Sequence, residues 1–189
     1  MIEVEIRGRL TEKQAGDMKR LLRKNGKHLD THTREMILLR GYKGYADNPT
    51  IRKVDIRLRN TDGRCEIVLK RKASDNNAGR EEIILKLQEK NLNTAKEIAK
   101  AFGSSKGLWM HRKKDVFQYR GVEWAIVEAP KKIFFFEAEK TVQNKKHVEA
   151  VRLALVKEAE SFGFNVFKPH EYVAFVNMLG RRVNKNISW

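Results

Sequence analysis

The start of the chain alternates apolar and charged side chains residue by residue. Ile2, Val4 and Ile6 would lie on one face of an extended strand, and the charged residues between them on the other. This two-residue period is typical of a strand with two unlike faces. It returns along the chain and predicts eight strands, over residues 2–9, 29–41, 51–59, 65–72, 80–88, 107–119, 121–129 and 133–141. The dominant element is therefore expected to be a sheet with one apolar and one charged face.

Helical segments separate and follow these strands. Thr11 and Gln14 form a capping-box pattern ahead of a helix over residues 12–25. Further helices are predicted from about Asn93 to Gly103, over residues 144–162, and from Pro169 onward. Turn residues at 61–63 and 74–79 favour hairpins, so neighbouring strands should run antiparallel. We predict one α+β domain over residues 1–189, built on an antiparallel sheet or a closed barrel with helices on its apolar face.

Net charge and cysteine content restrict the partners. Forty Lys and Arg against 24 Asp and Glu give a formal net charge of +16, which favours nucleic acid, nucleotides, polyphosphates or acidic lipid surfaces. The single cysteine, Cys65, excludes an internal disulfide framework and a multi-cysteine metal site. A reducing, cytoplasmic compartment is expected. No apolar run approaches the roughly 18 residues of a membrane span, and the first residues lack the apolar core of a secretory signal.

The charged positions are grouped by sign. Acidic pairs lie near the two ends of the strand set and basic pairs lie in its middle, and each pair shares one face of its strand. The acidic pairs are Glu3/Glu5 and Glu137/Glu139, and the basic pairs are Arg57/Arg59, Lys70/Lys72 and Arg112/Lys114. In an open sheet these faces would be solvated. In a closed sheet with helices outside they would line an interior, where carboxylates, a bound polyanion and divalent ions would neutralise the cations.

A closed interior of this composition has a defined chemistry. Four carboxylates supply the hard oxygen ligands that suit Mg²⁺ or Mn²⁺. Six guanidinium and ammonium groups suit a triphosphate, because arginine binds its oxygens in pairs and lysine acts as a point charge. The five histidines are scattered without metal-ligand spacing, which indicates surface or packing roles; they are His28, His32, His111, His147 and His170.

The order of these motifs resembles the CYTH superfamily, the triphosphate tunnel metalloenzymes. Residues 3–7 resemble its N-terminal Glu-x-Glu-x-Lys signature, with Arg7 in place of the lysine. The later matches are Arg57-Leu58-Arg59, Lys70-Arg71-Lys72, Arg80-Glu81-Glu82, Arg112-Lys113-Lys114 and Glu137-Ala138-Glu139, and Tyr172 lies where the family has a Ser-Tyr pair. The resemblance covers nearly the whole chain. A lone Glu-x-Glu means little, but this series in this order is specific.

The resemblance implies an eight-stranded antiparallel closed β-barrel, or tunnel, that binds a triphosphate and one or two divalent ions. By that analogy the metal ligands are Glu3, Glu5, Glu137 and Glu139. The phosphate-binding residues are Arg7, Arg57, Arg59, Lys70, Lys72, Arg112 and Lys114, with Arg80, Glu82 and Glu128 as candidate accessory residues. Glu128 is the nearest candidate for the acidic residue that the family carries before its last turn, and Val127 is the alternative at that position. Two departures bear on activity. Arg7 cannot exchange protons at neutral pH as a lysine can, and Ile84 stands where many members have a second acidic residue.

The leading functional prediction is a metal-dependent hydrolase of tripolyphosphate, a nucleoside triphosphate or thiamine triphosphate. Its partner is a triphosphate-containing small molecule, with nucleic acid secondary, and the protein is expected to be a monomer or homodimer that does not bind membranes. The alternatives are a class IV-type adenylyl cyclase and a non-catalytic polyphosphate- or RNA-binding module. The cyclases often carry a His-Phe pair before the first signature, where this chain has only Met1 and Ile2.

Overall fold

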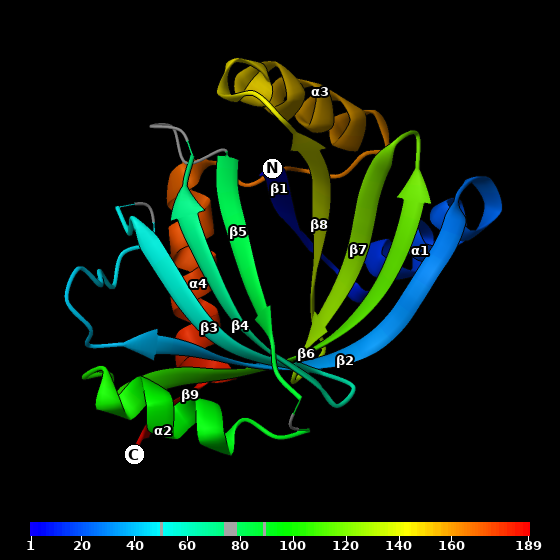
Figure 1. Ribbon diagram of the computed structural model, residues 1–189. Coiled ribbons are helices and arrows are strands. Elements are labelled where there is room, and N and C mark those ends of the chain that lie inside the picture. Colours follow the sequence, from blue (N-terminus) through cyan, green and yellow to red (C-terminus); the bar gives the residue numbers. More distant parts are fainter. Residues whose placement is uncertain (50, 74–78, 89) are drawn as a thin grey trace.

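The computed structural model describes residues 1–49, 51–73, 79–88 and 90–189. Strands dominate it (Figure 1). They are β1 (Ile2–Leu10), β2 (Lys27–Arg40), β3 (Val54–Thr61), β4 (Arg64–Lys72), β5 (Gly79–Lys86), β6 (Lys106–Tyr119), β7 (Val122–Ala129), β8 (Ile133–Val142) and β9 (Lys185–Ser188). The helices are α1 (Glu12–Asn25), α2 (Asn93–Ala101), α3 (Val148–Ser161) and α4 (Pro169–Arg182), with a short 3₁₀ turn at Lys145–His147 before α3.

Eight of the strands form one antiparallel ring. The order around it is β2-β3-β4-β5-β1-β8-β7-β6, and β6 returns to pair with β2. The β2–β6 pairing is long, since Lys27 faces Gln118 at one end and Arg40 faces Lys106 at the other. The β1–β5 pairing is short and runs only from Ile2 and Glu81 to Val4 and Gly79. The sequence-based expectation of an eight-stranded antiparallel closed sheet is thus confirmed.

Apolar side chains of the strands form a core outside the ring. Val4, Phe117 and Trp124 pack against helices α1 and α3, which lie over the β1, β8 and β6 side. A second outer cluster joins Ile37 and Leu58 to α2 on the opposite side. Covering the outer face with helices leaves the charged face of every strand for the interior.

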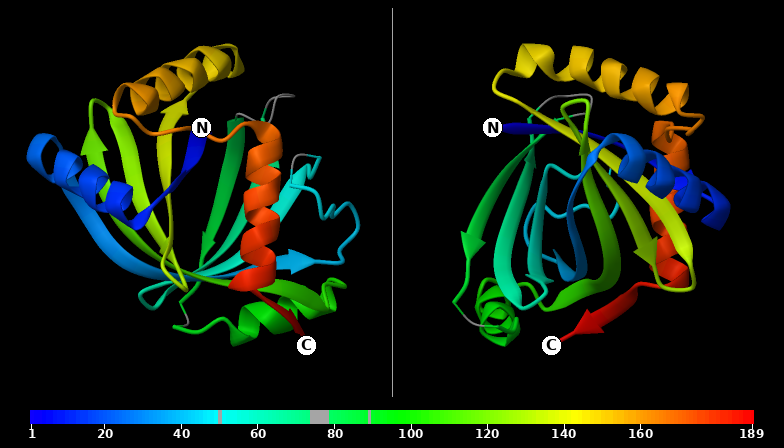
Figure 2. Two further views of the ribbon diagram at one scale, coloured as in Figure 1. Left: turned by 180° about the vertical axis from the view of Figure 1, so that it is seen from behind. Right: turned by 90° about the vertical axis from the view of Figure 1, so that its right-hand side faces the viewer.

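Helix α4 has a different place. It runs across one open side of the ring, as the first view of Figure 2 shows. Phe175 and Leu179 of α4 pack on Val127 and Phe135, which lie on the inner face because they are level with the inward-facing Glu137 in the β7–β8 register. Helix α4 therefore closes the ring with an apolar surface at one end of the charged interior.

Most predicted element boundaries agree with the structure to within two residues. The third strand begins at Val54 instead of residue 51 because the Arg52 side chain turns back into the preceding loop. Strand β9, which pairs with the first residues of β6, was not predicted. The predicted turn at 74–79 lies almost wholly outside the described residues. No helix in the described ranges is long and apolar enough to cross a bilayer.

Candidate active site

The strand register places almost every predicted site residue inside the ring. Directly opposed residues of an antiparallel pair point to the same face. Across β1 and β8, Glu5 opposes Glu139 and Arg7 opposes Glu137. The other strands alternate in the same way, and each contributes charged residues to the inner face of the ring. These residues are Glu3, Arg80, Glu82, Lys70, Lys72, Arg57, Arg59, Arg112 and Lys114. Acidic and basic side chains from different strands thus share the inner face of the ring and contact one another there.

Glu128 is the exception among the predicted residues. It opposes Lys113 on β6 and Phe134 on β8, so it lies on the outer face of β7. The inner position at this level is Val127, which packs against α4. The prediction of Glu128 as an accessory site residue is therefore wrong, because β7 turns its apolar side inward where α4 closes the ring.

Several inward-facing charges were missed in the sequence. Arg34 opposes Arg112 and Asp55 opposes Lys70, while Glu66 opposes Arg59 and Glu123 opposes Glu139. Each lies two residues from another inner position of its strand, so the two-residue period of the sequence already indicated that it faces inward. These residues were missed because none of them belongs to a pair of like charges at that spacing.

Glu137 holds two cations at the closed end of the interior. Its carboxylate accepts a hydrogen bond from Arg7 Nε at 3.1 Å and pairs with Lys114 Nζ. Burial opposes its charge, but Lys114 and Arg7 together hold the pKa of Glu137 well below its usual range. Arg7 also donates to Glu5 at 2.7 Å and to the Tyr172 hydroxyl of α4 at 3.0 Å. Glu137 is thus engaged as a counter-ion, and α4 is tied to the site through Tyr172.

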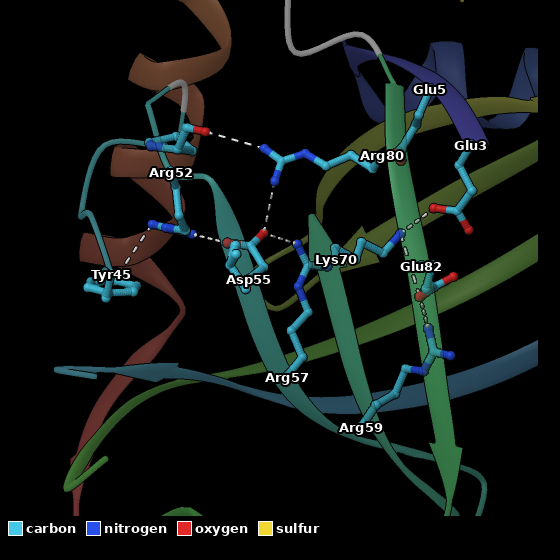
Figure 3. A network of polar contacts seen from close by, with 12 residues as sticks. Glu3, Glu5, Tyr45, Arg52, Asp55, Arg57, Arg59, Lys70, Arg80 and Glu82 are labelled. Carbon is cyan, nitrogen blue, oxygen red and sulfur yellow. Dashed lines mark hydrogen bonds and ion pairs between the residues drawn. The ribbon is translucent and has the colours of Figure 1, made fainter. Parts of the chain in front are cut away.

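A second group of charges lies between β1, β5 and β4, and is seen from close by in Figure 3. Lys70 Nζ contacts Glu3 at 2.6 Å and Glu82 at 3.7 Å. Arg59 reaches Glu82 at 3.4 Å and Glu66 at 2.8 Å. Burial and a hydrogen bond with Glu82 raise the pKa of Glu3 despite Lys70. The two predicted phosphate-binding cations here are already partly neutralised by carboxylates of the protein.

Asp55 gathers three arginines at the rim (Figure 3). It is 4% exposed and contacts Arg52 at 2.9 Å, Arg57 at 2.8 Å and Arg80 at 4.0 Å. Burial opposes its ionisation, but Arg57 and Arg52 lower the pKa of Asp55 to about 2. Arg52 also donates to the carbonyls of Ala46 and Asp47. This cluster fixes the loop of residues 41–49 beside the ring.

Two arginines of the inner face, the buried Arg112 and the half-buried Arg34, lack such counter-ions. Arg112 is 4% exposed and donates to the His111 carbonyl and the Asn184 side chain, and Arg34 donates to Thr61. Within the described residues, neither guanidinium lies within ion-pairing distance of a carboxylate. Burial lowers the pKa of Arg112 to about 10, and burial together with Arg59 lowers that of Arg34. A cation withdrawn from water without an ion pair is costly, so Arg112, with Arg34 opposite it, marks where an anion would bind most favourably.

Carboxylates are in excess at the opposite, open end. We call this group the acidic mouth; it comprises Glu3, Glu5, Glu123 and Glu139. Burial, with the charges of Glu5 and Glu3, raises the pKa of Glu139 to about 8. In the described parts of the chain, no three His, Cys, Asp or Glu side chains form a ready-made metal site. The donor set nevertheless fits Mg²⁺ or Mn²⁺, which are commonly held by one or two carboxylates together with substrate phosphates and water.

The acidic mouth predicts an unusual pH dependence of stability. A carboxyl whose pKa is raised on folding stabilises the native state fully below its unfolded value near 4.5, and this stabilisation is lost as pH rises through about 8. We therefore expect Glu139→Gln to leave the melting temperature almost unchanged at pH 5. At pH 9 the variant should be more stable than the parent by about 2 kcal/mol, allowing for solvent screening. Glu128→Gln, on the outer face, should show no such pH-dependent gain in a thermal denaturation series.

Several solved structures of other proteins share the fold of this chain. No family model and no curated protein matches the sequence. Among solved structures, the PH1819 protein of Pyrococcus horikoshii is similar, with TM-score 0.71 at 19% identity over 93% of this chain and 98% of that one. A Vibrio parahaemolyticus protein described as a proposed adenylate cyclase has TM-score 0.64 at 10% identity over 93% and 98%. HpAC1 of Hippeastrum, described as a proposed adenylyl cyclase with a dominant triphosphatase activity, has TM-score 0.58 at 15% identity over 94% and 95%.

Identities this low establish the fold alone. The chain shares the fold of these structures, and this agrees with the closed antiparallel sheet that the resemblance to the CYTH superfamily implies. The structures that share the fold include proteins described as proposed adenylate cyclases, and for one of them a dominant triphosphatase activity is described.

Proposed function

We propose that this protein is a metal-dependent triphosphatase that hydrolyses the terminal anhydride of a triphosphate held inside the ring. The observation that carries the proposal is the buried guanidinium of Arg112 beside the half-buried guanidinium of Arg34, neither of which is ion-paired with a carboxylate in the described residues. A phosphate chain would supply the missing counter-ions, and arginine binds phosphate oxygens in pairs. Tripolyphosphate, a nucleoside triphosphate and thiamine triphosphate all present this group.

The remaining cations would hold the rest of the chain. Lys114, Arg7, Arg57, Arg59 and Lys70 face the same space and are paired with carboxylates that an incoming phosphate can partly replace. Such exchange keeps the interior neutral both with and without ligand. Phosphoryl transfer is accelerated mainly by positioning and charge stabilisation, which these side chains provide from several directions.

A divalent ion fits the acidic mouth in this proposal. Glu5 and Glu139 would hold it, with Glu3 beside them, whereas Glu137 is engaged by Arg7 and Lys114. Bound there, Mg²⁺ or Mn²⁺ would neutralise phosphate charge as a Lewis acid. This revises the four-glutamate set expected from the motifs to three.

Two alternatives have some support. Structures described as adenylate cyclases share the fold, which favours cyclisation of ATP as the second candidate. A non-catalytic polyphosphate or RNA binder would explain the charge of +16. Such a binder would gain nothing from Glu5 and Glu139, because inward-facing carboxylates repel phosphate.

The deciding experiment is product analysis. Tripolyphosphate, ATP and thiamine triphosphate are each incubated with the protein with and without Mg²⁺ or Mn²⁺, and orthophosphate, pyrophosphate and cyclic AMP are quantified. We expect metal-dependent release of orthophosphate from at least one of them. Cyclic AMP with pyrophosphate would establish the cyclase instead, and binding without turnover would establish the non-catalytic module.

Glu139→Gln tests the metal role directly. The amide keeps the shape of the side chain but loses the charge that a divalent ion requires, so we expect turnover to fall at least 100-fold. The matched control is Glu128→Gln. Glu128 lies on the outer face of β7, the strand next to β8, so this variant should keep full turnover. Undiminished activity of Glu139→Gln in excess Mg²⁺ would contradict the assignment.

A further inference from the structure

His32 is a buried imidazole that the charge network described above does not use. It is 7% exposed, and it lies on the inner face of β2 because it opposes Lys114 of β6. Its Nδ1 is 2.9 Å from a carboxylate oxygen of Asp30. Its Nε2 is buried and has no hydrogen-bond partner among the described residues. A buried polar atom without a partner costs free energy, so its position requires an explanation.

The hydrogen bond to Asp30 settles which nitrogen carries the proton. A carboxylate only accepts, so Nδ1 must donate, and the neutral ring presents an available lone pair at Nε2. Burial, and the neighbouring positive charge of Arg34, lower the pKa of His32. The imidazole is thus a neutral proton acceptor at pH 7, with a carboxylate behind it that would stabilise the protonated form.

The local backbone places this acceptor beside the phosphate-binding cations. The β2–β6 register shifts between His28 and Asp30, which marks a bulge or irregularity. Bulges re-aim side chains and are frequent next to active sites. After the shift, Asp30, His32 and Arg34 all point to the inner face, with His32 between Arg34 on its own strand and Lys114 on the next. These two cations are among those that would hold the phosphate chain.

We propose that His32 is the general base of the reaction. This inference rests on the proposed triphosphatase function. Nε2 is fully covered in this structure, so a water molecule reaches it once the incoming phosphate chain has moved the side chains that cover it. This water donates a hydrogen bond to Nε2 and attacks the phosphorus held by Arg34 and Lys114. The new P–O bond forms from the water oxygen, the water proton passes to Nε2, and the electron pair of the breaking anhydride bond leaves with the departing phosphate. Asp30 is the positioning residue that fixes the tautomer and stabilises the imidazolium.

The activity test uses His32→Asn. An asparagine amide can still donate to Asp30 in place of Nδ1, but nothing replaces Nε2. We expect kcat to fall by about 10²–10⁴-fold, the usual contribution of a general base, while the melting temperature and the binding of tripolyphosphate are retained. The acidic limb of the pH–rate profile, below about pH 6.5, should vanish. His28→Gln is the control, because His28 is exposed and contacts only Thr31 and Phe117 in the described structure.

A second readout does not depend on turnover. The His32 ring is titrated by NMR, assigned by comparison with His32→Asn, with and without metal-free tripolyphosphate. The charged groups facing His32 are Asp30 and Arg34 on β2 and Lys114 on β6, and Arg64 of β4 lies 4.0 Å from Asp30. A bound polyanion beside these groups would favour the imidazolium, so the pKa should rise by about one unit.

The outcomes separate the two proposals. If the parent is active but His32→Asn keeps its turnover or its acidic limb, the general base is not His32. An unmoved His32 pKa with saturating tripolyphosphate shows that Nε2 does not face the ligand, and likewise overturns the inference. If the parent hydrolyses no triphosphate with either metal, the proposed function fails and the general-base role fails with it, whatever the NMR titration shows.

Discussion

Glu137→Gln is expected to lower the melting temperature by about 10 °C. Glu137 is the shared counter-ion of Arg7 and Lys114 in the interior. Removing one partner of a buried ion pair costs about 3–5 kcal/mol, because the remaining charge is left without compensation. In a domain of this size each kcal/mol corresponds to roughly 2–4 °C. Differential scanning calorimetry of the parent and the variant at pH 7 measures the difference.

A bound polyanion should recover part of this loss. Tripolyphosphate supplies the missing negative charge and binds only the folded state, so it should raise the melting temperature of Glu137→Gln more than that of the parent. Glu123→Gln is the control, since Glu123 is exposed on the same face and its replacement should shift the transition by less than about 2 °C. A Glu137→Gln variant as stable as the parent would show that the two cations are solvated.

Arg34→Met and Arg112→Met are expected to have the opposite effect on stability. Both guanidinium groups lose solvation on folding without gaining a carboxylate. Replacing even a buried ion pair by packed apolar side chains often stabilises a protein by about 1–4 kcal/mol, and these two guanidinium groups have no ion pair to lose, so we expect a gain within that range, larger for the buried Arg112 than for the half-buried Arg34. The same changes should weaken tripolyphosphate binding at least 100-fold, because each removes two donors that phosphate oxygens require. Calorimetry of unfolding and of ligand binding tests both halves.

Arg23→Met is the matched control for this pair. Arg23 is exposed in the last turn of α1, outside the ring, so the substitution should leave both stability and affinity nearly unchanged. A gain in stability coupled to a loss of affinity would identify Arg34 and Arg112 as residues retained for binding at the expense of the fold. Loss of stability in both variants, with affinity preserved, would contradict this assignment.

The sequence predicted the ring because its period of two is local and unambiguous. Every inward-facing doublet, from Glu3 and Glu5 to Glu137 and Glu139, lies where the alternation indicated. What the alternation could not supply is which strand follows which around the ring, because pairing of β2 with β6 joins segments about 80 residues apart. That closure came into the prediction through the resemblance to a known family.

The missed features depend on tertiary contacts that leave no local pattern. Val127 and Glu128 are both compatible with a strand, and only the packing of α4 decides that Val127 faces inward. His32 looked like one of five scattered histidines until the register placed it opposite Lys114. Strand β9, which pairs with β6, has only four residues. Four residues are too few to show a two-residue period in the sequence.

The order of strands around the ring has a consequence for how the chain folds. β1, at the very start of the chain, takes its longest partner from β8, so Leu10 meets Phe134 and Ile2 meets Val142. Strand β2 likewise cannot form its pairing with β6 until the later strand has been synthesised. Contacts between residues so distant in sequence form slowly, because the chain loses the entropy of closing the long loop before the pairing can stabilise it. During synthesis the first strand therefore stays without its main partner until residue 142 has been made, and its alternating glutamates and arginine keep that waiting edge soluble.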